Sequence, residues 1–186
     1  MRLFIAIPLP PDLALRASEI LPTSLPALRR VKPENLHVTL AFLGWIPDVR
    51  LDEVTSAARE AAAEVSRFEL TFEGAGRFPE RGRPRVVWIA IADGRPSVLR
   101  LGADVSAGLR SRGLRFDDRP LAPHLTLARV TEDATSAEGK TIVAALEGLA
   151  GPRLELVVDE IAVVQSVLSP KGPRYAALAT VPLAHN

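Results

Sequence analysis

Short apolar runs and longer amphipathic stretches alternate along the chain, and most are separated by residues typical of loops. The apolar run of residues 2–9 predicts a buried strand that ends at the following prolines, and Pro11 is placed to begin a short helix. Apolar positions at helical spacing predict a helix over residues 48–66, with Asp48 as its N-cap. The pattern therefore mixes strands and helices from the start.

The rest of the chain follows the same alternation. Further strands are predicted at residues 36–44, 68–78, 85–93, 123–130, 154–169 and 174–183, further helices at 98–114 and 137–150, and a turn at 169–174. The segments joining neighbouring strands are short, which favours antiparallel pairing.

The strand of residues 36–44 has two different faces, because side chains alternate along a strand. One face carries Leu36, Val38, Leu40 and Phe42, and the other carries His37, Thr39, Ala41 and Leu43. In the strand of residues 123–130, Leu125 and Leu127 lie opposite His124 and Thr126 in the same way. Each strand thus has an apolar side for the core, which leaves its His and Thr for solvent or a cleft.

The order of elements repeats once: strand, helix, His-x-Thr strand, helix and strands occur in each half. His37 and His124 lie 87 residues apart, close to half of the 186-residue chain. We therefore predict an α+β fold of two pseudo-symmetric lobes around a central cleft, each lobe a mostly antiparallel sheet with helices on its outer face. The lobes would be about 1–90 and 91–186 of a single domain, between which terminal strands could be exchanged.

Composition limits the classes of function. The chain is 47% hydrophobic and 24% charged, as in ordinary globular proteins, and its net charge of +1 offers no overall attraction to nucleic acid or membrane. Any anion site must then be a local patch. The absence of cysteine excludes disulfides and thiolate chemistry. The N-terminal apolar run is too short for a signal peptide, and no run approaches the ~18 residues of a membrane span, so we expect a cytoplasmic protein.

Two of the three histidines occur in the same phrase, His-x-Thr-x, at His37 and His124. Residues i and i+2 point to the same side of a strand, about 7 Å apart, so each imidazole is presented with the hydroxyl of Thr39 or Thr126. One neutral and one protonated imidazole on opposite sides of a phosphorus would form an acid–base pair for in-line displacement. The hydroxyls could hydrogen-bond the non-bridging oxygens.

Other interpretations of the two histidines are less favoured. A single histidine on a strand is more often structural, but the repetition of the phrase favours function. Zinc usually takes three or four ligands, and no acidic residue stands at i±2 beside either histidine, so we expect no metal site. The third histidine, His185, is the penultimate residue and is assigned no role.

Five segments carry a resemblance to a known family. They are MRLFIAIPLP, PENLHVTLAFLG, RPRVVWIAI, APHLTLAR and VVQSVLSPKGPRYAAL. In this order they resemble the two-histidine phosphoesterase superfamily, and within it the bacterial and archaeal branch called RNA 2′,3′-cyclic phosphodiesterase or 2′-5′ RNA ligase. The resemblance extends from Arg2 to about Leu183.

The resemblance implies hydrolysis of RNA 2′,3′-cyclic phosphate ends to 2′-phosphomonoesters, without a metal or other cofactor. It implies that His37 is the proton donor and His124 the proton acceptor, and that Thr39 and Thr126 hold the phosphate. Some members of the family also join RNA ends through a 2′-5′ linkage. We expect an RNA partner, no obligate protein partner and a monomer.

Residues that contact the substrate are less sharply indicated. Arg129 follows the second motif where the family often carries a basic residue, but strict alternation places it opposite His124. Phe4 and Phe42 could stack on a base, although both lie in apolar runs that favour core packing. Ser166 and Tyr175 could line the groove. A local basic patch is predicted in the loop that carries Arg77, Arg81, Arg83 and Arg85.

Two other functions stay open on the sequence alone. The groove could bind RNA ends without turnover, although binding alone would not need two titratable groups with matched hydroxyls. A cyclic phosphodiesterase for a small nucleotide, such as an ADP-ribose cyclic phosphate, would need a closed pocket in place of a basic path.

Overall fold

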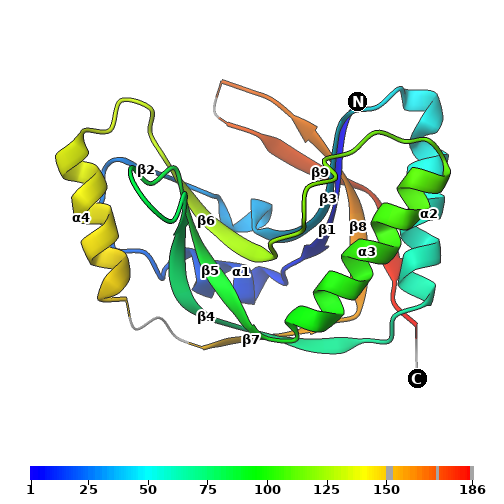
Figure 1. The fold of residues 1–186 in the computed structure, drawn as a ribbon, viewed down its shortest axis with the longest axis horizontal. Coiled ribbons are helices and arrows are strands. Elements are labelled where there is room, and N and C mark those ends of the chain that lie inside the picture. Colours follow the sequence, from blue (N-terminus) through cyan, green and yellow to red (C-terminus); the bar gives the residue numbers. More distant parts are fainter. Residues whose placement is uncertain (150–152, 171, 185–186) are drawn as a thin grey trace.

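A computed structural model describes residues 1–149, 153–170 and 172–184. The strands are β1 (Arg2–Pro8), β2 (Leu28–Arg30), β3 (His37–Trp45), β4 (Phe68–Phe78), β5 (Val86–Asp93), β6 (His124–Val130), β7 (Leu154–Val158), β8 (Glu160–Val167) and β9 (Arg174–Pro182). The α-helices are α1 (Pro11–Ser18), α2 (Leu51–Ala63), α3 (Arg95–Ser111) and α4 (Ser136–Glu147), and the 3-10 helices are η1 (Pro33–Asn35) and η2 (Asp48–Arg50). The predicted α+β class is confirmed (Figure 1).

The strands form one curled antiparallel sheet in the spatial order β7-β4-β5-β6-β3-β1-β8-β9, with β2 beside β6. This order is symmetric about its centre, where β6 and β3 pair through Val38 and Leu125. Outward from the centre, β5 corresponds to β1, β4 to β8 and β7 to β9. The fold is therefore two pseudo-symmetric halves of one sheet. The division of the chain into lobes near residue 90 stays a prediction.

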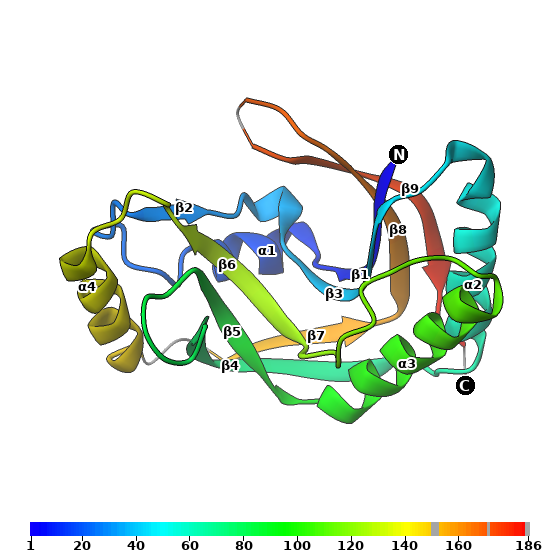
Figure 2. The same cartoon turned by 45° about the horizontal axis from the view of Figure 1, so that its top comes forward.

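Two helices cover each half of the sheet. Figures 1 and 2 show α2 and α3 together at one end of the molecule and α4 at the other, with α1 behind the strands. Helix α3 contacts β3, and α2 contacts β8 and β9, whereas α4 contacts β4 and α1 contacts β7. The helix that follows the first strand of each half, α1 or α3, thus packs against the other half.

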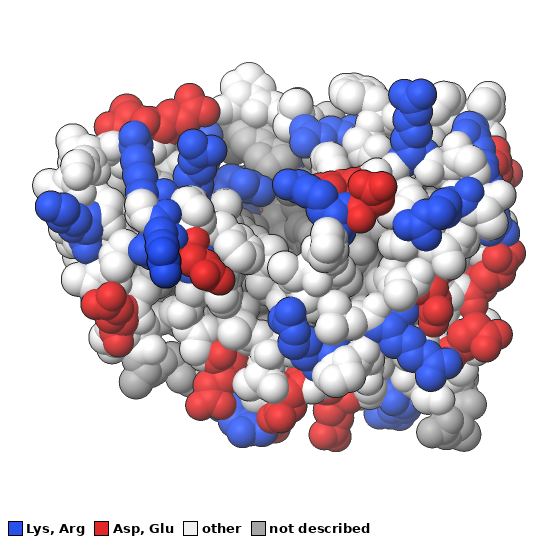
Figure 3. Space-filling model, in the orientation of Figure 1, with Lys and Arg blue, Asp and Glu red and all other residues white. Residues whose placement is uncertain are grey.

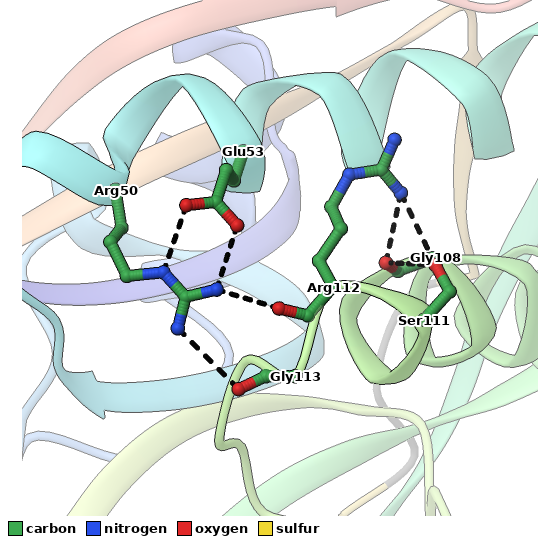
Figure 4. A network of polar contacts seen from close by, with 6 residues as sticks. All are labelled: Arg50, Glu53, Gly108, Ser111, Arg112 and Gly113. Atoms are coloured by element: carbon green, nitrogen blue, oxygen red, sulfur yellow. Dashed lines mark hydrogen bonds and ion pairs between the residues drawn. The ribbon is translucent and has the colours of Figure 1, made fainter.

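Helices α2 and α3 are joined by small residues and by an arginine. A Cβ atom at Gly108 would lie only 3.2 Å from the Cβ of Ala57, so the helices approach closely because neither residue has a long side chain. Arg50 donates to the Glu53 carboxylate and to the carbonyl of Arg112, which closes the end of α3 onto the start of α2 (Figure 4).

The structure corrects three details of the predicted elements. Asp48 does not cap α2, because that helix begins after η2 and the Asp48 carboxylate accepts a hydrogen bond from the N-terminal amine. The predicted strand of residues 154–169 breaks at Asp159 into β7 and β8, which pair with different neighbours. The sequence pattern missed β2, whose three residues are too few to show a period. Residue 150 of the predicted helix, residue 171 of the predicted turn and His185 lie outside the described residues.

Candidate active site

The centre of the sheet brings the two His-x-Thr phrases together. Residues directly opposed in an antiparallel pair are exchanged by a local two-fold axis perpendicular to the sheet. Val38 and Leu125 form such a pair, and each follows a motif histidine by one residue. The axis therefore carries the first motif onto the second and leaves both on the same side of the sheet, here called the histidine face.

Each motif strand contains a β-bulge directly after its threonine. Thr39 and Ala41 pair with consecutive residues of β1, so Leu40 is the extra residue, and Leu127 is the extra residue of β6 against β5. A bulge re-aims the side chains that follow it. Consequently Phe42 and Arg129 return to the histidine face, which corrects the prediction from strict alternation for both residues.

Exposure follows the bulges. Leu40, Ala41 and Leu43 are buried, whereas Phe42 is 37% exposed and lies under the guanidinium of Arg2, 5.2 Å from its ring centroid. The predicted core packing of Phe42 is therefore wrong. In β6 the equivalent position, two residues after the bulge, holds the exposed Arg129.

Both imidazoles are oriented by the same type of contact. The Nδ1 atom of His37 lies 2.7 Å from the carbonyl oxygen of Asn35, and that of His124 lies 2.7 Å from the carbonyl oxygen of Ala122. A carbonyl only accepts hydrogen bonds, so both Nδ1 atoms carry a proton. In the neutral rings the lone pair is consequently on Nε2, which is the nitrogen left for a substrate.

Aromatic rings enclose the histidines differently in the two halves. His37 lies against Phe4 and Tyr175, with ring centroids 4.7 and 5.5 Å away. Phe4 is buried, as the predicted core packing requires, and its ring also lies against His37. Ser166 is the cross-strand partner of Tyr175 and lies on the same face of the hairpin formed by β8 and β9.

Beside His124 the neighbouring rings are Phe78 at 5.0 Å and Trp88 at 6.0 Å. Trp88 lies across β4, where a side chain at Gly76 would collide with the indole. The indole N–H is buried and makes no hydrogen bond among the described residues. Sequence reasoning missed Phe78 and Trp88. The signal that could have found Trp88 is the alternation of side chains along β5, which places it on the same side as Ala90.

Burial is the largest cause that lowers the pKa of His37 below its ordinary value, since desolvation disfavours the imidazolium. The Asn35 carbonyl raises this pKa, and the charges of His124 and Arg129 lower it. Burial likewise lowers the pKa of His124, with a raising contribution from the Ala122 carbonyl and a lowering one from Arg129. Both imidazoles are thus biased toward the neutral form when no anion is bound.

Three polar side chains of the histidine face have no partner in the part of the chain that the structure describes. Among the described residues, the hydroxyls of Thr39 and Thr126 and the guanidinium of Arg129 make no hydrogen bond, and Arg129 forms no ion pair. Two arginines of the predicted basic loop donate hydrogen bonds to backbone carbonyls of the protein. Arg77 donates to the carbonyls of Pro79 and Gly82, and Arg83 donates to the carbonyl of Glu132.

Figure 3 shows a hollow in the part of the view where Figure 1 places η1, β6 and the β8–β9 hairpin, with basic side chains on both sides of it. A separate cavity of about 380 Å³ lies elsewhere, between the end of α2 and the end of β9. That cavity contains neither histidine. The titratable and unpaired groups make the histidine face the candidate site.

Comparison with known proteins identifies the family. Residues 9–169 match the 2′-5′ RNA ligase superfamily. The chain therefore belongs to this superfamily. One relative, the RNA 2′,3′-cyclic phosphodiesterase of Archaeoglobus fulgidus, is 33% identical over 96% of this chain and 98% of its own. The enzyme of the same name from Thermus thermophilus is 34% identical over 96% of this chain and 88% of its own.

Two solved structures share the fold. TT0787 of Thermus thermophilus superposes with a TM-score of 0.78 and 29% identity, over 100% of this chain and 99% of that one. E. coli LigT complexed with 3′-AMP gives a TM-score of 0.75 and 25% identity, over 99% of this chain and 98% of that one. The recognition of the two-histidine phosphoesterase family from its motifs is confirmed.

Two further observations describe the rest of the molecule. In the part of the chain that the structure describes, His, Asp and Glu side chains do not gather in groups of three or more that could hold a metal ion. No described helix is both long and apolar enough to cross a membrane.

Proposed function

We propose that this superfamily member hydrolyses RNA 2′,3′-cyclic phosphate ends to 2′-phosphomonoesters by paired-histidine acid–base catalysis. The observation that carries the proposal is the local two-fold pairing of two strands, each of which holds an imidazole by Nδ1. Each strand leaves Nε2 and a threonine hydroxyl without a partner among the residues that the structure describes. The curated names of the relatives support the same substrate class.

In the proposed reaction His124 is the base and His37 the acid, as family resemblance suggests. Nε2 of His124 takes a proton from water as the water oxygen attacks phosphorus. The P–O3′ bond breaks, and Nε2–H of His37 protonates the departing 3′ oxygen, which leaves the phosphate on the 2′ oxygen. Each positioned proton transfer contributes about 10²–10⁴-fold. After turnover the protons exchange with solvent.

The remaining polar groups stabilise the negative charge of the phosphate. The hydroxyls of Thr39 and Thr126 donate to the non-bridging oxygens, and Arg129 offsets the negative charge that develops there. The bound anion also raises the pKa of both histidines, because an opposite charge favours the imidazolium. Binding of the substrate therefore restores the protonated acid that burial disfavours in the free protein.

The proposal extends to three finer points. A 5′ hydroxyl group that replaces water would give a 2′-5′ linkage, so ligase activity uses the same groups. All of the proposed groups come from one chain, so a monomer without a protein partner is sufficient. The cytoplasm, where an RNA substrate is available, is the proposed compartment.

The experiment is hydrolysis of a short RNA with a 2′,3′-cyclic phosphate end, in EDTA, by wild type, His37→Ala and His124→Ala. We expect a 2′-phosphate, placed by NMR, that each variant forms at least ~10²-fold more slowly. A matched control is Arg100→Ala, on the exposed side of α3.

Three results would contradict the proposal. Wild type that binds the RNA end tightly without turnover would indicate a binding protein. Loss of activity in EDTA with rescue by one divalent ion would indicate metal catalysis. Equal activity of both histidine variants and wild type would remove the paired-histidine mechanism.

A further inference from the structure

Strand β2 places a second arginine directly opposite Arg129. The register of β2 against β6 pairs Arg29 with Arg129, and both side chains are exposed. Opposed residues of an antiparallel pair point to the same side of the sheet with Cβ atoms about 4.5–5.5 Å apart. Because the bulge at Leu127 turns Arg129 to the histidine face, Arg29 lies on that face as well.

The position of Arg29 is fixed by its backbone. Strand β3 pairs with β6 only near the histidines, and β2 occupies the same edge of β6 farther along. The amide of Val31 donates to the carbonyl of Leu127, and that of Thr131 donates to the carbonyl of Ala27, which extends the pairing beyond both ends of β2. The two arginines are therefore held opposite each other by the sheet.

Like charges directly opposed across two strands destabilise a sheet unless another charge offsets them. Among the described residues, neither Arg29 nor Arg129 has an ion pair or a side-chain hydrogen bond. The neighbouring Arg30, which points to the other face, donates to the carbonyls of Leu21 and Pro22 and so has a structural role. The opposed pair thus lacks a counter-charge within the described part of the chain.

We propose that Arg29, together with Arg129, which also faces the reacting phosphate, forms a second phosphate site that binds the phosphodiester on the 5′ side of the terminal nucleotide and makes an RNA chain the preferred substrate over a nucleoside cyclic phosphate. This inference rests on the proposed function. Arginine presents a planar fork of donors that matches phosphate oxygens, and two forks on one face can share one phosphate. Arg129 lies near the end of β6 that is remote from His124, and Arg29 lies beside it on β2, so the arginine pair lies outward from the histidines on the same face.

The test compares three substrates that differ in one charge. They are a nucleoside 2′,3′-cyclic phosphate, a dinucleotide with the same cyclic end, and that dinucleotide with an uncharged methylphosphonate linkage. For wild type we expect kcat/KM for the charged dinucleotide to exceed that for the methylphosphonate at least about tenfold, as for hydrogen bonds to a charged group. Arg29→Ala should reduce this preference, because only Arg129 is left to bind the phosphodiester, and should leave kcat/KM for the nucleoside cyclic phosphate unchanged.

Two readouts separate the subsite from a general effect. Arg29→Ala should reduce the salt dependence of kcat/KM for the charged dinucleotide by about one phosphate contact, whereas Arg100→Ala should not. Since removal of Arg29 relieves a like-charge pair, Arg29→Ala should fold and unfold at a Tm no lower than wild type. Arg29→Gln provides a second variant with similar side-chain length.

The outcomes are distinct. Equal losses on all three substrates in Arg29→Ala would overturn the subsite, and so would a wild type that treats the charged and methylphosphonate dinucleotides alike. If wild type hydrolyses none of them, the proposed function fails, and calorimetry then decides the subsite separately. If the subsite exists, the affinity for a dinucleotide with a terminal 2′-phosphate should still decrease in Arg29→Ala. The affinity for a nucleoside 2′-phosphate should not change.

Discussion

The two halves of the site share a backbone plan but differ in their side chains. Both present a histidine anchored through Nδ1 by the carbonyl two residues earlier, a threonine, and a bulge at the next residue. At the position that each bulge returns to the histidine face, one half has Phe42 and the other has Arg129. In the proposed mechanism the shared plan serves transfer of protons to and from opposite sides of one phosphorus, and we expect the difference between Phe42 and Arg129 to orient the substrate.

Burial also differs between the halves. The hydrogen bond of His37 is partly buried, and Asn35, which accepts it, also donates through its side chain to the carbonyl of Pro173. The β8–β9 hairpin is thereby fastened beside His37. The hydrogen bond of His124 is exposed. The halves can therefore be distinguished by experiments on leaving group, charge, packing and pH.

The largest effect is expected from a change of leaving group. With a normal cyclic phosphate, His37→Ala and His124→Ala should each lose about 10²–10⁴-fold in kcat. A substrate with sulfur in place of the 3′ oxygen needs no proton on the departing atom. His37→Ala should therefore recover to within roughly tenfold of wild type on this substrate, whereas His124→Ala should not. Recovery of His124→Ala in single-turnover assays would show that the roles are exchanged.

Replacement of Arg129 should have the next largest effect. Arg129→Ala should lower kcat/KM by roughly 10–100-fold, because a hydrogen bond to a charged group is lost. The charge of Arg129 lowers the pKa of both histidines, so its removal should move the acid limb of the kcat/KM profile to higher pH. Arg129→Lys should keep the acid limb in place, since the charge remains.

Phe42→Ala is the matched change in the other half. It should weaken kcat/KM by less than Arg129→Ala and leave the acid limb unmoved, because a phenyl ring carries no charge. A shift of the acid limb in Phe42→Ala equal to that in Arg129→Ala would contradict the assigned difference between the halves.

The contrast between Phe42 and Arg129 shows what the sequence could and could not predict. The alternation of apolar and polar residues located both motif strands and placed each His and Thr on one face, because these positions precede the bulges. Beyond Leu40 and Leu127 the prediction was wrong, since an extra residue in one strand depends on its neighbour, which lies far away in sequence. Strand β2 and its arginine were missed because three residues carry no period.

One added methyl group at Gly76 should lower the stability of the protein, because Trp88 packs directly on this residue. Gly76→Ala would place a Cβ atom inside the ring of Trp88, so we expect a loss of about 1–3 kcal/mol in the free energy of unfolding. The equivalent pair in the other half is Ala162 opposite Ala6, where no ring has to be accommodated. Activity of Gly76→Ala should fall together with its stability, because Trp88 lies beside His124.

A second glycine gives the control of opposite sign. At Gly139 in α4 a Cβ atom would make ordinary contact with Pro84, at 3.5 Å, so Gly139→Ala should stabilise the helix by about 0.5–1 kcal/mol. Urea denaturation of both variants measures the difference. A Gly76→Ala protein as stable as wild type would mean that Trp88 has another place to lie.

The smallest effect is a pH dependence of stability. Both histidines have a pKa in the folded protein below the unfolded value of about 6.5. As pH falls through that value, the unfolded chain therefore binds more protons than the folded protein does. Their contribution to stability is therefore present above pH 6.5 and decreases below it. His37→Gln should lose more of this dependence than His124→Gln, because burial is the leading cause and His37 is the more enclosed ring.

Urea midpoints at pH 5.5, 6.5 and 7.5 give each contribution as the difference from wild type, which cancels the carboxylates common to all three proteins. A His37→Gln protein with the full wild-type slope would place the buried charge penalty elsewhere. If the slope is lost as expected, the penalty on imidazolium in the free protein is the same quantity that the bound phosphate has to offset, and the acid limb of kcat should then lie at higher pH than that of kcat/KM.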